Sequence, residues 1–537
     1  MKKFLYLSLL TAFAFKLNAQ NLDSLYNEFI KIRLGTEAIG VAAAIEEELV
    51  KCGFGIANEV KLNYDKFDPK QKKVLSSLLT RPQSQKSFVS PSGFFRIHYD
   101  TIGTNKPGYD LNQLAAAFDS SYNFEVNILG YPSPPKDNGQ GGDDKYDVYI
   151  ANLAASYYGN TYNEDPLTAE TYTSYIEIDN DFSSTYTHGI EAARVTAAHE
   201  FHHAIQMGNY VFRNADSFYH EITSTAMEEF VFDDVNDYYG YLKSFFDKTY
   251  ETMIDQYGGY NLAIWNIFLK DRFGFDILKR IWELMRTERA LYAIRDAIAE
   301  YSSTFKAEFN TFGQWLYFTK ERAQAGKYFE EAANYPKVKP TIELTLPQQS
   351  MEISTEPVST NFLFYYNNTG QGIDTLITII TNADVTNGVA KPDSLTKLSY
   401  AVSTQDGSGY KQIFEGYYSK LESEFPLRLV ESNILNKSAG QGHFATVDYA
   451  FPQPFKYSND GFIYFPADGV STSADIYIYS VDMNLVFSGS QTVDHNNMTV
   501  SWNVLDKSGN RLGTGVYFYY VKTDTLNKKG KFVILND

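Results

Sequence analysis

The sequence predicts a multidomain protein in which an α+β region is followed by all-β modules. The chain has 537 residues, 44% of them hydrophobic, which is more than one core usually supports. Strand-like runs between residues 94 and 178 precede helix-like runs between residues 192 and 333, an order typical of α+β architecture. Beyond residue 340, apolar and polar residues alternate between Gly, Asn and Asp turns, which predicts strands to the C-terminus.

The N-terminus has the pattern of a secretory signal peptide. Lys2 and Lys3 precede a mainly apolar run over residues 4–15, and Ala19 offers a small residue at a cleavage point. The run is too short to anchor the chain in a bilayer, and no later stretch reaches about 18 uninterrupted apolar residues. We expect a signal peptide over residues 1–19, no transmembrane anchor, and a mature protein that is secreted or attached to the cell surface.

Charge and cysteine content narrow the classes of partner. The 47 basic and 65 acidic residues give a net charge of -18, which argues against nucleic acid and anionic lipid. The chain holds one cysteine, Cys52, so no internal disulfide can form. Two interpretations of Cys52 stay open: a small buried residue, or a thiolate that occupies the open position of a metal site and keeps that site idle.

Four segments follow the signal peptide in the predicted organisation. Helical spacing of apolar residues over 22–34 and 37–51 predicts a helical N-terminal segment, which is a candidate propeptide. The expected segments are the N-terminal segment over 20–92, the α+β domain over 93–336, a β-sandwich module over 341–450, and an immunoglobulin-like module over 451–537. Within the α+β domain, the run at 173–178 is the expected edge strand that would pair with an extended peptide.

A run of helix formers carries the strongest chemical signal. Residues 192–207 lack Gly and Pro and predict one buried helix. His199 and His203 are four residues apart, so both imidazoles project from one face and can bind a single metal ion. Glu200 lies beside them, where it can act as a general base on a water. His202 is interpreted as a supporting or packing residue.

A catalytic zinc site needs a third protein ligand and one open position. The pattern with a third histidine would place Gly at 206 and His at 209, but Gln206 and Asn209 stand there, which excludes it. The helix-like run 218–230 offers glutamates instead, and Glu221 is the predicted third ligand. Glu228 falls seven residues later on the same face, where it can accept a hydrogen bond from a ligand histidine.

These two motifs carry a resemblance to a known group of enzymes. His199 to His203, followed by Glu221-Ile-Thr-Ser-Thr-Ala-Met-Glu228, resembles the glutamate zincins, the thermolysin and aminopeptidase type. Residues 95–99, 142–149, 177–182 and 257–259 are similar to a family of exported bacterial metallopeptidases, and this similarity spans about residues 94–336. In the second motif, Ile222 and Thr223 replace the Gly and Phe of the zincin pattern.

The resemblance implies a zincin-like catalytic domain over residues 93–336. One catalytic Zn²⁺ would be held by His199, His203, Glu221 and a water, and Glu200 would take the proton of that water as it attacks a peptide carbonyl. The implied function is a secreted zinc-dependent metallopeptidase acting on proteins or peptides. The alternative is a catalytically silent, zincin-like surface adhesin or binding protein, although the presence of Glu200 favours the enzyme.

Weaker signals concern other ligands of the same domain. Tyr257 and Tyr260 are candidate donors to the oxyanion, or aromatic residues that only pack. Two acidic groups could coordinate Ca²⁺, but their spacing differs from the calcium-loop pattern and favours solvated turns. These groups are Asp143, Asp144 and Asp147, and Glu177, Asp179 and Asp181.

The C-terminal module has its own resemblance. Strand-like runs at 476–481, 500–502 and 513–519, separated by Gly-rich turns, are typical of an immunoglobulin-like sandwich. The run at 513–519 and the basic residues over 528–531 resemble the C-terminal sorting domain of the type IX secretion system. That system's machinery is the implied partner, and an accessory sandwich is the alternative. Neither interpretation gives the module a catalytic residue.

Overall fold

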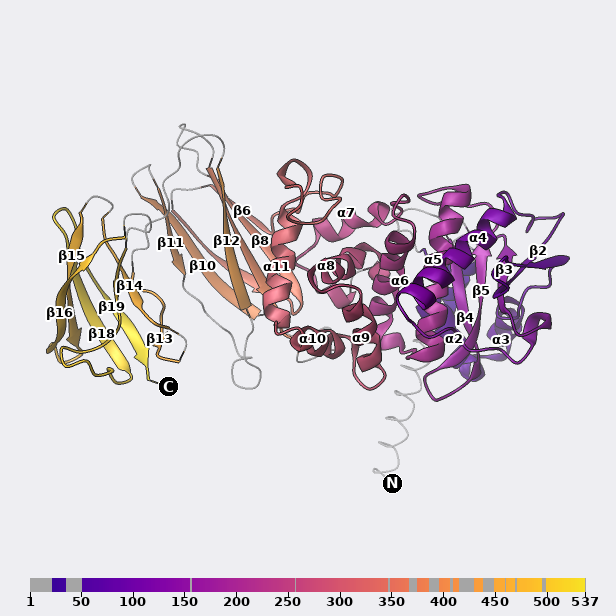
Figure 1. The fold of residues 1–537 in the computed structure, drawn as a ribbon, viewed down its shortest axis with the longest axis horizontal. Coiled ribbons are helices and arrows are strands. Elements are labelled where there is room, and N and C mark those ends of the chain that lie inside the picture. The colour runs from indigo at the N-terminus through magenta and orange to yellow at the C-terminus, as the bar shows by residue number, and fades with distance from the viewer. Residues whose placement is uncertain are drawn as a thin grey trace, which may run out of the picture.

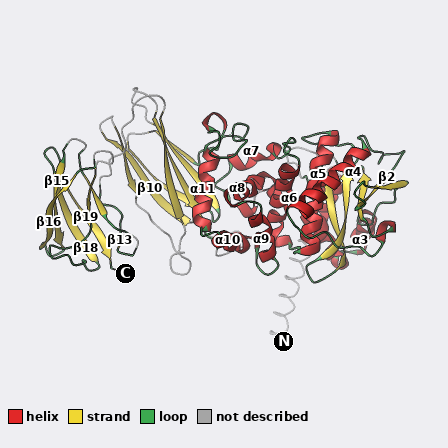
Figure 2. Cartoon of the chain, in the orientation of Figure 1, coloured by secondary structure: helices red, strands yellow, loops and turns green. Residues whose placement is uncertain are grey.

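The structure is a computed structural model, and its three consecutive parts are visible in Figure 1. The structure describes residues 22–34, 51–154, 157–255, 257–345, 348–366, 374–385, 396–405, 409–414, 429–437, 449–458, 460–468, 471–494 and 499–536. The expected signal peptide and most of the second expected N-terminal helix lie outside these residues. A mixed sheet with a helical region and a β-rich C-terminal part follow one another, so the α+β and multidomain predictions are confirmed (Figure 2).

The first sheet is mixed and has the strand order β1-β2-β3-β5-β4. Its strands are β1 (Lys86–Val89), β2 (Phe95–Tyr99), β3 (Tyr146–Ala151), β4 (Gly159–Pro166) and β5 (Tyr172–Asp179). Strands β2, β3 and β5 are parallel, and the two outer strands, β1 and β4, are antiparallel to their neighbours.

The prediction that residues 173–178 form an edge strand is wrong, because they lie within β5, between β3 and β4. The edge near the helices is β4, which the sequence did not reveal. Its residues include Gly, Asn, Asp and Pro, which are depleted in strands and are typical of turns.

Helices cover both faces of this sheet. The described helices of the chain are the one over residues 22–34, α2 (Phe54–Leu62), α3 (Pro69–Leu78), α4 (Leu111–Tyr122), α5 (Gly189–Asn209), α6 (Ser217–Val231), α7 (Tyr239–Asp247), α8 (Ala263–Phe273), α9 (Asp276–Met285), α10 (Ala290–Glu300) and α11 (Phe305–Tyr317). Of these, α2, α4 and α5 contact the sheet directly. Helices α4 and α5 share a core with Ile97, Val148 and Ile176 on one face.

The N-terminal segment covers the opposite face of the sheet. Phe29 and Val60 belong to one buried cluster with Tyr149, Tyr162 and Tyr175 of the sheet. Helix α3 begins with Pro at its first position, and its N-cap Asp68 forms a capping box with Gln71. The N-terminal segment is therefore a packed layer of the fold.

The β-rich part contains two bodies. The first has sheets in the orders β12-β9-β8-β6 and β11-β10-β7. Its strands are β6 (Ile342–Thr345), β7 (Gln348–Thr355), β8 (Ser359–Tyr366), β9 (Asp374–Asn382), β10 (Thr396–Gln405), β11 (Gly409–Phe414) and β12 (Leu429–Lys437). Phe362 and Ile377 join the core of the preceding helices, so this body packs directly on the helical region, against α11.

The C-terminal body has a separate core. Its sheets have the orders β13-β19-β18-β15-β16 and β14-β17. The strands are β13 (Phe455–Lys456), β14 (Ile463–Pro466), β15 (Ser473–Ser480), β16 (Leu485–Thr492), β17 (Thr499–Trp502), β18 (Gly515–Lys522) and β19 (Asn527–Leu535). The basic run at 528–531 lies inside β19, the last strand, rather than before it. Among the residues described, no helix has the length and apolar character needed to cross a bilayer.

Candidate metal centre

Helix α5 passes between the first sheet and helix α6, and contacts both. From Ala192 to Gly208 nearly every residue is buried, because apolar residues surround the helix on all sides. His199, Glu200 and His203 are at most 1% exposed. Burying polar side chains in such a place costs free energy unless each finds a partner.

The two histidines and Glu221 of α6 converge on one point. The Nε2 atoms of His199 and His203 are 3.1 Å apart. Oε2 of Glu221 lies 3.1 Å from Nε2 of His199 and 3.3 Å from Nε2 of His203. Ligand atoms about 2.0 to 2.1 Å from a tetrahedral ion lie about 3.3 Å from one another, so these spacings match a zinc site. The structure brings the three predicted ligands together.

The hydrogen bond made by Nδ1 of each imidazole determines which of the two ring nitrogens carries the proton. Nδ1 of His199 donates to Oε1 of Glu228 over 2.7 Å, as expected for Glu228. Nδ1 of His203 donates to Oε1 of Gln206 over 2.9 Å. The Nε2 atoms therefore present lone pairs to each other and to the Glu221 carboxylate. These lone pairs repel one another unless a cation lies between them.

Burial keeps both imidazoles neutral. It lowers the pKa of His203 to about 4 and also lowers the pKa of His199, where Glu221 opposes the shift. Neutral imidazole is the form that binds metal, so the donor set fits a zinc ion.

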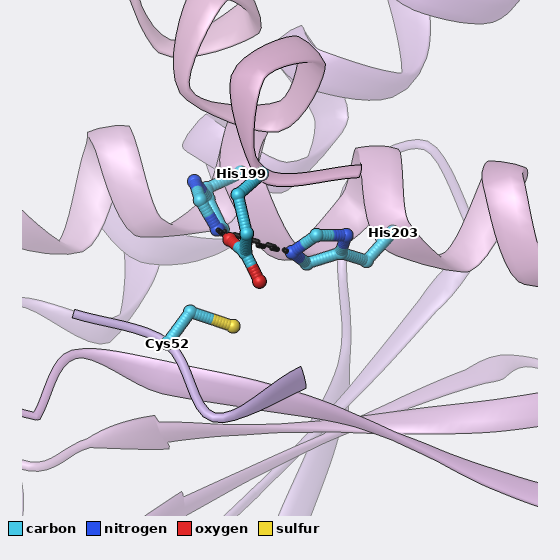
Figure 3. A group of neighbouring side chains, drawn as sticks. Cys52, His199 and His203 are labelled. Carbon is cyan, nitrogen blue, oxygen red and sulfur yellow. Dashed lines mark hydrogen bonds and ion pairs between the residues drawn. The ribbon is translucent and has the colours of Figure 1, made fainter. Parts of the chain in front are cut away.

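Cys52 is a fourth donor at the same point. One ligand atom from each of Cys52, His199, His203 and Glu221 lies within 4.8 Å of the others. Cys52 is 4% exposed, and Figure 3 shows its sulfur pointing toward the two imidazoles. Burial raises the pKa of the thiol, and the charges of Glu200 and Glu221 raise it further. Thiolate, imidazole and carboxylate are all ligands that zinc uses in proteins.

Glu200 lies beside the donors without joining them. Its Oε2 accepts a hydrogen bond of 2.8 Å from the hydroxyl of Thr161 on β4. Its Oε1 has no hydrogen-bond partner among the residues described and is buried. Burial raises the pKa of Glu200, while His199 and His203 oppose the shift. Thr161 thus fixes one carboxylate oxygen, and the carboxylate also lies beside the Cys52 thiol, so it can exchange a proton with a neighbouring group.

Glu228 has a second partner that the sequence did not suggest. The ammonium of Lys51 lies 2.6 Å from Oε2 of Glu228 and also pairs with Asp237. Burial would lower the pKa of Lys51, but the attraction of Asp237 and Glu228 outweighs it and raises the pKa. This lysine is fully buried and carries a charge matched by two carboxylates.

Several other sequence predictions can be placed. Nδ1 of His202 bonds Oε2 of Glu125 over 2.7 Å in a buried pair, so His202 supports packing. Tyr260 lies against His199, with ring centroids 6.1 Å apart. The side chain of Tyr257 lies outside the described residues.

The acidic groups considered for Ca²⁺ have partners within the protein. Asp143 pairs with Arg96 over 2.5 Å, Asp147 pairs with Arg81, and Glu177 lies 2.7 Å from Arg33. Asp179 accepts backbone N–H groups, including that of Phe182 over 2.7 Å, as in a turn. Calcium binding stays an untested expectation.

Comparisons with known proteins identify no family. No protein-family profile and no curated protein sequence matches the chain. PorZ, a surface component of the type IX secretion system of Porphyromonas gingivalis, is similar at 13% identity and a TM-score of 0.14, over 30% of this chain and 29% of PorZ. Dimeric latent PorU from the same bacterium is similar at 11% identity and a TM-score of 0.15, over 33% of this chain and 20% of PorU. The chain spans less than a third of either protein, and scores this low carry no argument about function.

Proposed function

We propose that this chain is a secreted zinc-dependent metallopeptidase. The observation that supports it most is the convergence of His199, His203 and Glu221, at 3.1 to 3.3 Å, beside a buried Glu200 carboxylate. The finding that this buried cluster can hold a metal ion does not depend on the proposal. The zincin-like identity of residues 93–336 is part of the proposal.

Each residue has a distinct task. His199, His203 and Glu221 would hold the ion, and Glu228 and Gln206 fix the imidazole rings so that Nε2 faces inward. Zinc, when bound, lowers the pKa of a water to about 7 and polarises a carbonyl.

Glu200 performs the proton transfers in this proposal. It takes a proton from the attacking water and delivers it to the departing amine, so that the peptide C–N bond breaks and two chain ends form. Thr161 holds one carboxylate oxygen in place while the other receives the proton.

A second candidate is a silent zincin-like adhesin or binding protein. It is favoured by Cys52, because four protein donors resemble a closed structural zinc site, whereas catalytic sites keep one position open. The two candidate functions differ in whether the Cys52 thiolate can dissociate from the metal ion.

The deciding experiment is digestion of a peptide library by the purified protein, both as the full chain and after limited proteolysis. Cleavage that a chelator abolishes, and that added Zn²⁺ restores, supports the peptidase. Absence of cleavage in every form that retains stoichiometric zinc contradicts it.

We further propose that residues 451–537 form an immunoglobulin-like sorting domain read by type IX secretion machinery. Supporting it are a core of its own and two sheets, in the orders β13-β19-β18-β15-β16 and β14-β17, that make a sandwich. Fusing these residues to a periplasmic reporter in a host with that system should send the reporter to the cell surface. Retention of the fusion in the periplasm contradicts the assignment.

A further inference from the structure

We infer that residues 51–58 keep the metal centre latent, with Cys52 as the fourth metal ligand and its neighbours in the place that a peptide substrate needs. The inference rests on the proposed peptidase function. This one segment engages three groups that the proposed peptidase would use: the metal donors, the edge strand β4, and the hydroxyl of Tyr260. A cysteine that only filled space would account for none of these together.

The first group is the metal site itself. The sulfur of Cys52 lies among the donors of His199, His203 and Glu221, all within 4.8 Å. A tetrahedral ion held by these four residues has no position left for a water. The peptidase chemistry therefore requires the thiolate to leave the ion first.

The second group is the outer edge of β4. The backbone N–H of Tyr158 donates to the carbonyl of Lys51 over 2.9 Å, and Cys52 forms a parallel bridge with Gly159. An unpaired strand edge is a template for an extended chain, and here the segment already occupies the end nearest the metal.

Asn58 of α2 occupies the next part of the same edge. Its amide nitrogen donates to the carbonyl of Thr161 over 2.8 Å, and its side-chain oxygen accepts from the N–H of Asn163 over 2.6 Å. The carboxamide thereby replaces the peptide group of a neighbouring strand. No extended peptide can pair with residues 158–163 while this segment stays.

The third group is the hydroxyl of Tyr260. It donates to the carbonyl oxygen of Cys52 over 2.6 Å and accepts from the N–H of Cys52 over 3.0 Å. Both hydrogen-bonding capacities of this hydroxyl are thus used by the backbone of Cys52. When the segment leaves, the hydroxyl becomes able to bond the backbone of a bound peptide.

The residues around Cys52 fit their places closely. Lys51 is held by Glu228 and Asp237. A Cβ on Gly53 would lie 2.3 Å from the hydroxyl of Tyr157, so a larger residue there would displace that buried side chain. The ring of Phe54 stacks on that of His203, with centroids 3.9 Å apart and an interplanar angle of 2°. Four consecutive residues therefore have specific contacts around the site.

The geometry also indicates where the chain can be cut between this segment and the sheet. Gln83 and Gln85 are exposed and lie between the end of α3 and β1, which begins at Lys86 and pairs with β2. A cut there leaves the sheet whole. Full removal of the N-terminal layer that includes Phe29 and Val60 would expose the buried Tyr149, Tyr162 and Tyr175, so lifting residues 51–54 is the smaller change.

The first test measures ligation without activity. The full secreted chain and its Cys52→Ser variant are loaded with Co²⁺ and compared by absorption spectroscopy. We expect a sulfur-to-cobalt charge-transfer band in the wild type and its loss in Cys52→Ser, with about one metal ion retained per chain in both. Absence of the band in the wild type overturns the inference.

The second test measures hydrolysis of a peptide library by four zinc-loaded proteins. These are the wild type, Cys52→Ser, Cys52→Ser with Asn58→Ala, and Cys52→Ser with Asn63→Ala. The last is the matched control, because Asn63 is an asparagine at the end of α2 whose side chain bonds Glu59 and Lys66 and not the edge of β4. We expect Cys52→Ser to be at least about 10-fold faster than the wild type, Asn58→Ala to add a further gain, and Asn63→Ala to add none.

The outcomes separate the latency from the function. A wild-type chain as active as Cys52→Ser overturns the latency and leaves the peptidase standing. A charge-transfer band in the wild type, together with no hydrolysis by Cys52→Ser or by a chain cut at a protease site inserted between Gln83 and Gln85, makes Cys52 a permanent ligand and overturns the peptidase.

Discussion

The region around α5 and α6 and the C-terminal body bury very different side chains. The former buries His199, Glu200, His203, Glu221 and Glu228, none more than 3% exposed. The core of the latter is apolar, built around residues such as Trp502. Buried ionisable groups cost free energy, so their concentration in one place indicates a site that uses them. Substitutions in the two regions should therefore have different consequences.

The largest effect should come from removing an imidazole ligand. His203→Ala deletes one of three donors at 3.1 to 3.3 Å spacing, so we expect loss of the zinc ion and of all hydrolysis. Elemental analysis of the purified variant measures the metal directly. His188→Ala is the matched control, because His188 is exposed just before the same helix and should leave the zinc content unchanged.

Replacing the base should separate metal binding from catalysis. Glu200→Gln keeps the size and the acceptor for Thr161 but cannot take a proton, so we expect hydrolysis to fall about 10²- to 10⁴-fold with zinc retained. We would measure the rate of peptide cleavage and the zinc content in the same sample, with Cys52→Ser as the parent protein. Glu191→Gln, at an exposed position of α5, should behave as the parent protein. Retained activity in Glu200→Gln would contradict the mechanism.

The two glutamates of α6 should rank in order. Glu221→Ala removes a donor and should release zinc or weaken its binding strongly, whereas Glu228→Ala should cost about 10- to 100-fold in affinity or activity. Lys51 keeps Asp237 as a partner in the second variant, which limits the damage. Zinc affinity by competition with a chromogenic chelator distinguishes the two variants, and the reverse order would show that the ligand assignment is wrong.

Helical periodicity explains how much of this site the sequence could predict. His199 and His203 share a face because they are four apart, and Glu221 and Glu228 share one because they are seven apart. Both relations are local, so the elements α5 and α6 and their inward faces were predictable. The mixed sheet was also predicted from three of its strands, β2, β3 and β5.

The rest depends on contacts between distant segments. Cys52 reaches the cluster through its bridge to Gly159, in a strand with the composition of a turn, so no local pattern indicated the contact. Lys51 meets Glu228 across 177 residues for the same reason. In the sequence, Gln206 only excludes the third-histidine pattern, whereas in the structure its side chain orients His203. Long-range pairing carries this information, and periodicity does not.

The smallest effect on the site should come from the C-terminal body. Trp502 is 1% exposed and packs against Phe465, Phe487 and Phe532, within a core separate from that of the helices. We expect Trp502→Ala to destabilise this body by about 3 to 5 kcal/mol, the usual cost of such a truncation, while zinc content and peptide cleavage stay at parent values. Calorimetry should show one transition shifting to lower temperature and the transition of the helical region unmoved. A loss of zinc in this variant would mean that the two regions fold as one unit. The difference between their buried side chains would then not separate a region that only contributes stability from a region that binds metal.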